Sequence, residues 1–213
     1  ASDAGRADPH GLNADVREAL SRLRTSLRAP GGGRALDASE LELLLRCCAG
    51  PDERAEAAIG VLEPSELTDE ALHRLTTALA DATDWPGAAV SAFSRHVLLP
   101  RLSRLDTPAS RTLSGAFLAL QRQRAAAVVD DLLVPLVKRP GLRPAQTELV
   151  GRLAKELPPP AQRRLVVTLL HRPPSAAAPP IVWGEAQMGV LQAVLALRPP
   201  LDGAALAAAV DHV

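Results

Sequence analysis

The sequence is poor in the residues on which much binding and catalytic chemistry depends. Its 213 residues include no tyrosine, two phenylalanines, two tryptophans and two cysteines. Platforms for stacking nucleic-acid bases are therefore scarce. The two cysteines, Cys47 and Cys48, are adjacent in an apolar helical pattern, where neighbouring side chains diverge by about 100° and cannot form an unstrained disulfide. We expect both to be reduced, buried hydrophobic residues of an intracellular protein.

Sequence motifs of enzymes and metal sites are also missing. The five histidines form no HExxH pattern and no pair at ligand spacing. The stretch "PGGGR" lacks the Lys-Ser/Thr of a phosphate-binding loop and is interpreted as a linker. Ser94 and His96 are two positions apart and point to different helix faces, and Asp130 with Asp131 is more typical of a solvated face than of an acid–base pair. We predict a protein without metal, cofactor or catalysis; a catalytic site assembled only in space stays an alternative.

Long hydrophobic runs are absent as well. No stretch of 18 uncharged apolar residues occurs and no signal-peptide pattern opens the chain, so we predict neither membrane insertion nor secretion. Because the chain starts without methionine and stops within a helical pattern, we expect it to be a piece of a longer protein.

A zero net charge hides two oppositely charged parts. Residues 1–84 contain 9 Lys+Arg and 16 Asp+Glu, net −7, whereas residues 85–213 contain 15 and 8, net +7. Such asymmetry is typical of differently solvated surfaces and also of separate docking faces. Arginines of the basic part predict, as an alternative function, direct binding of nucleic-acid phosphates by a helical scaffold.

Helix starts recur along the chain. Asp37, with Glu40 three residues later, predicts a capping box, and Thr68 predicts a second N-cap. Thr107 predicts a third, with Pro108 at the first helical position. No β pattern is present, so the predicted fold class is all-α.

The expected helices form a repeating array. Pro100 and Pro135 lie inside expected helices and should kink or split them. The further helical segments are predicted at residues 12–27, 51–62, 86–104, 125–138, 142–157, 160–171, 183–197 and 202–212. The first leucines or isoleucines of successive units recur at intervals of 31, 38, 37 and 39, at Leu36, Leu67, Leu105, Leu142 and Ile181. Each interval holds about two helices, which predicts an α-solenoid of antiparallel hairpins. We assign residues 1–35 to a tail, a helix and a Gly-rich linker, and residues 36–213 to the helical-repeat domain.

Several words in the sequence resemble those of one family. They are "LDASELELLLRCC", "VLEPSELTDEAL", "LDTPASRTLSGAFLAL", "VLLPRL", "LVPLVKRPGLRPAQTELVGRLAKEL" and "WGEAQMGVLQAVLALRPPLDGAALAAAV". Together they are similar to the C-terminal domain of Fanconi anaemia group E proteins, from about Leu36 to Val213, and "GLRPAQTELV" is the most specific of them. The resemblance implies a stack of helical hairpins related to HEAT repeats, continued beyond Val213 by about one more pair of helices that carry part of the substrate-docking surface.

The resemblance also implies a function and partners. Proteins of this family are adaptors of the Fanconi core complex, a nuclear ubiquitin ligase of interstrand crosslink repair. They connect the group C protein, and through it the group F protein, to the group D-two substrate. For group C binding, we predict exposed arginines beside the apolar stripes: Arg95, Arg104, Arg111 and Arg122.

Overall fold

The structure is a computed structural model that describes residues 12–29, 36–82, 85–171, 183–201 and 203. The chain divides into two compact units. Unit 1 comprises Ala1–Pro100 and Ser110–Leu120, and unit 2 comprises Arg101–Ala109 and Gln121–Val213. Every regular element in the described ranges is helical, which confirms the all-α prediction. Of the expected helix at 202–212, all residues but 203 lie outside the described residues.

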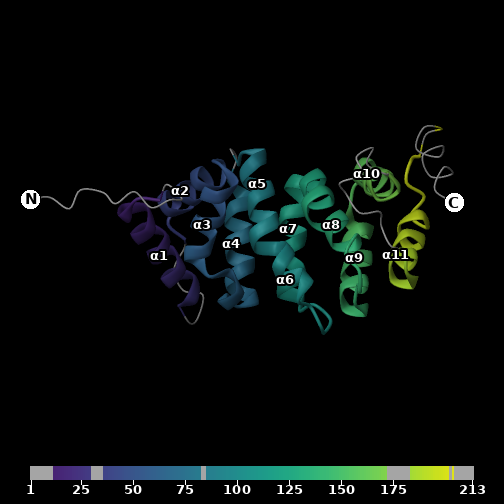
Figure 1. Ribbon diagram of the computed structural model, residues 1–213, viewed down its shortest axis with the longest axis horizontal. Helices are drawn as coiled ribbons and strands as arrows, with labels where there is room; N and C mark the ends of the chain where they lie inside the picture. The colour runs from purple at the N-terminus through teal and green to yellow at the C-terminus, as the bar shows by residue number, and fades with distance from the viewer. Residues whose placement is uncertain (1–11, 30–35, 83–84, 172–182, 202, 204–213) are drawn as a thin grey trace, which may run out of the picture. The chain divides into compact units, whose positions relative to one another are not determined.

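Unit 1 is built from consecutive helices that pack against their neighbours (Figure 1). α1 contacts α2, α3 and α4, while α5 packs on α2 and α3. The unit also contains the first part of α7. Its elements are α1 (Ala14–Arg28), α2 (Ala38–Cys48), α3 (Asp52–Leu62), the 3₁₀ turn η1 (Pro64–Glu66), α4 (Asp69–Asp81), α5 (Gly87–Phe93) and the π-helix η2 (Ser94–Leu98).

The helix α1 is anchored by an apolar stripe and by two ion pairs. Leu20, Leu23 and Leu27 are buried, as their spacing on one helix face requires. Glu63, the residue that follows α3, accepts hydrogen bonds of 2.6 Å from both Arg24 and Arg28 of α1. α1 is therefore part of unit 1.

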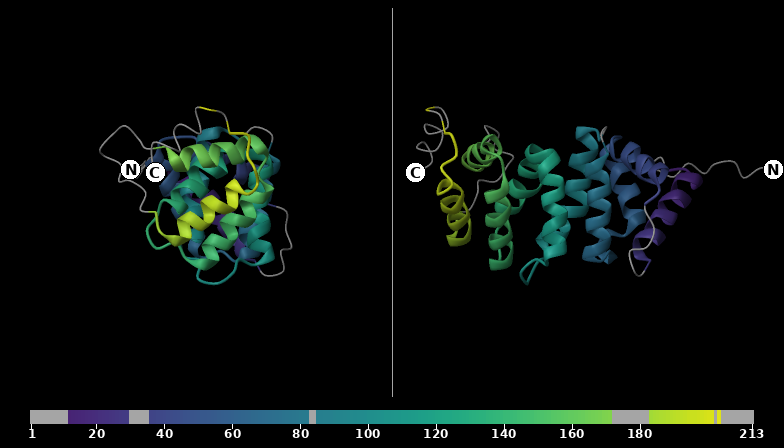
Figure 2. Two further views of the ribbon diagram at one scale, coloured as in Figure 1. Left: turned by 90° about the vertical axis from the view of Figure 1, so that its right-hand side faces the viewer. Right: turned by 180° about the vertical axis from the view of Figure 1, so that it is seen from behind.

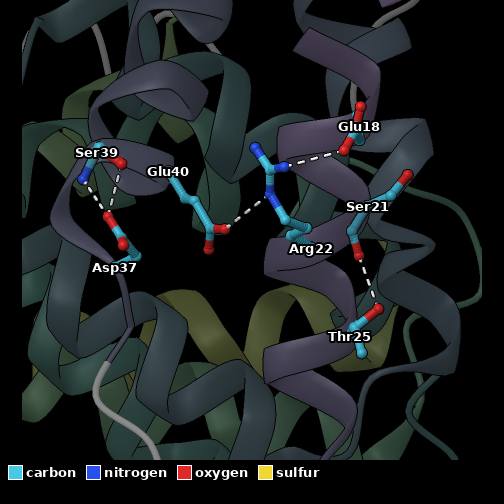
Figure 3. Close-up of polar contacts among 7 residues, drawn as sticks. All are labelled: Glu18, Ser21, Arg22, Thr25, Asp37, Ser39 and Glu40. Carbon is cyan, nitrogen blue, oxygen red and sulfur yellow. Dashed lines mark hydrogen bonds and ion pairs between the residues drawn. The ribbon is translucent and has the colours of Figure 1, made fainter. Parts of the chain in front are cut away.

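Two of the three predicted N-caps are confirmed. The Asp37 carboxylate accepts a hydrogen bond of 2.8 Å from the Ser39 amide, and the Thr68 hydroxyl accepts one of 3.1 Å from the Ala71 amide. Glu40 lies 3.7 Å from the guanidinium of Arg22, as Figure 3 shows. The carboxylate at the third position of α2 thus faces α1, and the capping box predicted for Asp37 and Glu40 stays a prediction.

The predicted start of the next helix was wrong. α7 (Arg111–Val128) begins three residues after Pro108, and its cap is Ser110 rather than Thr107. The Ser110 hydroxyl accepts a 3.0 Å hydrogen bond from the Leu113 amide and donates one of 2.6 Å to Asp69 in the first turn of α4. A bond to another helix thus fixes where α7 begins.

Unit 2 repeats the packing of helices in series. α9 contacts α11, and α10 contacts η3, α8 and α11. The neighbouring α9, α10 and α11 can be followed by their colours in the right-hand view of Figure 2. α6 (Leu99–Ser103) and α7 each have residues in both units, and α7 has a non-helical residue, Arg124, at φ −139° and ψ 50°. The remaining elements are η3 (Val129–Leu133), α8 (Val134–Val137), α9 (Pro144–Glu156), α10 (Pro159–Leu170) and α11 (Glu185–Leu195).

The two prolines inside helices have the same local structure, 35 positions apart. A five-residue π-helix precedes each, η2 before Leu99-Pro100 and η3 before Val134-Pro135, and the chain stays helical through both prolines. The amide of Leu99 donates to Ser94 five residues back, and that of Val134 donates to Val129. Each helix was expected to kink or split at its proline; instead a π-helix precedes the proline and the helical chain is not broken. The recurrence of this arrangement supports the repeat.

Both cysteines are buried and unbridged, as predicted. Burial raises the pKa of the Cys48 thiol to about 12, and the neighbouring Cys47 thiol acts in the same direction. Since the thiolate is the reactive form, Cys48 is chemically inert near neutral pH.

Candidate protein-interaction surfaces

In unit 1, Arg95 takes part in an ion-pair cluster at the surface. One nitrogen of Arg95 lies 3.1 Å from the Asp52 carboxylate at the start of α3, and His96 Nε2 lies 3.2 Å from the same oxygen. η2 presents these two consecutive residues to α3. Ser94, which precedes them, is fully buried, so Ser94 and His96 point apart as expected.

The cluster tunes the acidity of its carboxylate. The hydrogen bond with His96 holds the pKa of the Asp52 carboxyl below its ordinary value, and the nearby Arg95 guanidinium lowers it further, against the opposing effect of desolvation. Asp52 is therefore ionised near neutral pH. Arg95 keeps 46% of its side chain exposed while paired, so it can contact a partner without leaving Asp52.

The other three candidate arginines are exposed. Arg111 lies in the first turn of α7 within unit 1, whereas Arg104 and Arg122 belong to unit 2. No ion pair joins any of these three to a carboxylate in the described part of the chain. The candidates thus fall into one pair in each unit, Arg95 with Arg111 and Arg104 with Arg122.

Four buried glutamines, which the sequence analysis missed as a group, hold unit 2 together. Each donates its side-chain amide to a main-chain carbonyl of another helix or of the segment at its end. Gln146 bonds Leu102 O at 3.1 Å and Ser103 O at 3.0 Å, and Gln187 bonds Arg139 O at 3.0 Å. The last turn of α9 is bonded from two sides, Leu153 O by Gln121 at 3.1 Å and Ala154 O by Gln162 at 3.2 Å.

A signal for three of these four glutamines was present in the sequence. The dipeptide Ala-Gln occurs in the first turn of α9, α10 and α11, at Gln146, Gln162 and Gln187. The word "GLRPAQTELV" therefore has a structural role as well as its family resemblance. Its glutamine also accepts a 2.9 Å hydrogen bond from the Arg143 amide, which closes the N-terminus of α9.

Acidic groups elsewhere are engaged in ion pairs. Asp130 accepts three hydrogen bonds of 2.6 to 3.0 Å from the Arg164 guanidinium on α10, and this interaction raises the pKa of Arg164. Asp130 is thus a structural ion-pair partner, in keeping with the interpretation of a solvated face.

In the described ranges, no group of three or more His, Cys, Asp or Glu side chains is placed to hold a metal ion. None of the helices in those ranges has the length and apolarity needed to cross a membrane.

Serially packed helices with a glutamine-bonded interior and arginines on the outside define an all-α helical-repeat protein. Comparison with known proteins identifies the family to which it belongs. The family model of the Fanconi Anaemia group E protein FANCE matches residues 7–198. Fanconi anemia group E protein from Homo sapiens is 30% identical over 156 residues, which cover 71% of this chain and 28% of the human protein. The chain belongs to the Fanconi anaemia group E family.

Two consequences follow from the extent of these matches. The family match begins at residue 7 and ends at residue 198, so it includes α1 and all the similar words except the end of the last one. The chain spans just over a quarter of the length of the human relative. As a member of this family it is a protein of the Fanconi anaemia pathway.

Proposed function

We propose that the chain acts as a non-catalytic adaptor of the Fanconi core ubiquitin-ligase complex in the nucleus. In this role it links the group C protein, and through it group F, to the group D-two substrate for monoubiquitination in interstrand crosslink repair. The observation that carries the proposal is the family match over residues 7–198. The ligase chemistry would belong to other subunits.

The surface chemistry supports binding of a protein over binding of nucleic acid. Three of the four aromatic residues, Trp85, Phe93 and Phe117, are at most 3% exposed, and Trp183 is half-buried. Stacking platforms for unpaired bases are therefore almost absent from the surface. The exposed arginines offer instead planar donors suited to the carboxylates of a partner protein.

The pair Arg95 and Arg111 on unit 1 is the proposed contact for the group C protein. We expect the chain and group C protein to co-elute on gel filtration at micromolar concentration. The double variant Arg95→Glu/Arg111→Glu should weaken that complex by about tenfold or more, because loss or reversal of charge pairs at interfaces costs a few kcal/mol. Both side chains are exposed, so helicity by circular dichroism should stay unchanged.

The control is Lys155→Glu, a single charge reversal at an exposed position in the last turn of α9. It should leave the complex intact. Absence of any complex between a folded chain and group C protein would contradict the proposal. Tight binding to DNA with a steep dependence on salt, in place of the protein complex, would favour the nucleic-acid alternative.

A further inference from the structure

Two glutamines, Gln146 and Gln187, bring separate basic segments of unit 2 next to the starts of α9 and α11. The bonds of Gln146 to Leu102 O and Ser103 O, at 3.1 and 3.0 Å, set the first turn of α9 against the end of α6. The bond of Gln187 to Arg139 O, at 3.0 Å, sets the first turn of α11 against the segment that follows α8. The short loop 138–143 connects the two places, turning at Gly141 with φ 74°. Residues just after α6 and α8 thus adjoin the starts of α9 and α11.

Cations predominate there. We call the group Arg104, Lys138, Arg139 and Arg143 the basic rim. Arg104, Arg139 and Arg143 are exposed and Lys138 is half-buried.

The nearby carboxylates offset only part of this charge. Asp106 pairs with Arg143, which fastens the segment after α6 to the start of α9. Glu148 pairs with Arg152 one turn into α9, at 2.8 Å, and Glu185 lies in the first turn of α11. In the described ranges, no carboxylate forms an ion pair with the other three cations of the rim.

Main-chain dipoles add to the positive potential. The starts of α9 and α11 carry the partial positive charge of helix N-termini. The carbonyls of Leu102, Ser103 and Arg139, which would contribute negative charge, are covered by the glutamine amides. Unit 2 as a whole contains 13 Lys+Arg against 8 Asp+Glu, net +5. A negatively charged ligand would be attracted to the unit and held at the rim.

We infer that the basic rim is a docking surface for an acidic segment of a partner protein. Three cations without carboxylate partners suit a short run of Asp and Glu. Nucleic-acid binders commonly neutralise about 6–10 phosphates, and the rim has too few cations for that. This inference rests on the proposed adaptor function and adds to it the place and chemistry of a second contact, separate from Arg95 and Arg111.

The test uses the full 213-residue chain and a fluorescein-labelled peptide of six Glu-Ser repeats, with binding followed by fluorescence anisotropy. The unaltered chain should bind the peptide. The double variant Arg104→Glu/Arg139→Glu should bind the peptide at least about tenfold more weakly, because loss or reversal of charge pairs at an interface costs a few kcal/mol. Lys155→Glu at the opposite end of α9 should change binding by less than about twofold, because exposed charges at that separation are largely screened. Arg104→Gln/Arg139→Gln should give an intermediate loss and guards against misfolding caused by new charges.

Three outcomes would overturn the inference. They are no binding of the peptide by the unaltered chain, equal losses in the rim variants and in Lys155→Glu, and a rim-dependent preference for a labelled single-stranded oligonucleotide over the peptide. Group C binding, measured in parallel on gel filtration, keeps the two proposals apart. If the chain forms the group C complex but fails the peptide test, only the docking role of the basic rim is contradicted. If the chain passes the peptide test but forms no group C complex, the proposed group C contact is contradicted.

Discussion

The substitution Gln146→Glu should destabilise unit 2 by about 3–5 kcal/mol at neutral pH. The side chain is 4% exposed and its amide donates to two carbonyl oxygens, at 3.1 and 3.0 Å. A carboxylate of the same shape removes both donors and sets a buried negative charge against two oxygens at a helix end. In urea, the unfolding midpoint should fall by about 1 M or more, since the slope for small proteins is about 1–3 kcal/mol per M.

The pH dependence of this variant gives a second signature. Burial and the facing carbonyls would raise the pKa of the introduced carboxyl above its unfolded value of about 4.3. Its protonated form is uncharged and can donate one of the two hydrogen bonds again, so part of the lost stability should return as pH falls through the raised pKa. Gln123→Glu, the same change at an exposed position of unit 2, should shift the midpoint by less than about 0.5 kcal/mol. Equal effects of the two substitutions would contradict the role assigned to Gln146.

The substitution Phe93→Ala should destabilise unit 1 by about 3–5 kcal/mol. Phe93 is 1% exposed and meets the buried Trp85 edge to face, with ring centroids 5.7 Å apart and an interplanar angle of 67°. The truncation leaves a cavity beside the indole, and aromatic pairs of this geometry add about 0.5–1.5 kcal/mol beyond buried area. Urea unfolding followed by tryptophan emission in a Trp183→Phe background reports on Trp85 alone.

The conservative variant Phe93→Leu keeps most of the volume and should cost about 1.5 kcal/mol or somewhat more, because the aromatic pair is still lost. The truncation Met188→Ala removes a side chain that is 41% exposed and should have little effect. Similar midpoints for Phe93→Ala and the unaltered chain would show that this aromatic contact does not stabilise unit 1.

Features governed by neighbouring residues were predictable from the sequence. The caps Asp37 and Thr68 act on amides two and three residues away, and Pro144 occupies the first position of α9. Burial of Leu149 and Leu153 follows from the 3.6-residue period alone. Local chemistry of this kind was enough for the fold class and for most helix bounds.

Features that depend on distant partners were not predictable in the same way. Thr107 and Ser110 are equally good caps by type, and the choice of Ser110 depends on Asp69, 41 residues earlier. The glutamine bonds of Gln146 join residues 43 and 44 positions apart. The π-helices before Pro100 and Pro135 also exceed what a proline rule states, because proline alone predicts a broken helix and not the helix type that replaces it.

The surface arginines were likewise predictable only in part. Exposure of Arg104, Arg111 and Arg122 followed from their positions beside the apolar stripes, whereas the link between Arg95 and Asp52 required the fold. The rim around Arg104 emerged only from the glutamine bonds that join α6 to α9 and the end of α8 to α11. The contacts of these arginines with partner proteins stay proposals.

The central claim is that the chain bridges two proteins. The most direct measurement immobilises group C protein on a sensor surface and passes group D-two protein over it, with and without the chain bound. We expect retention of group D-two protein only after the chain has bound, at a level that follows the amount of chain. Equal retention with and without the chain, or none on a surface loaded with it, would contradict the adaptor function.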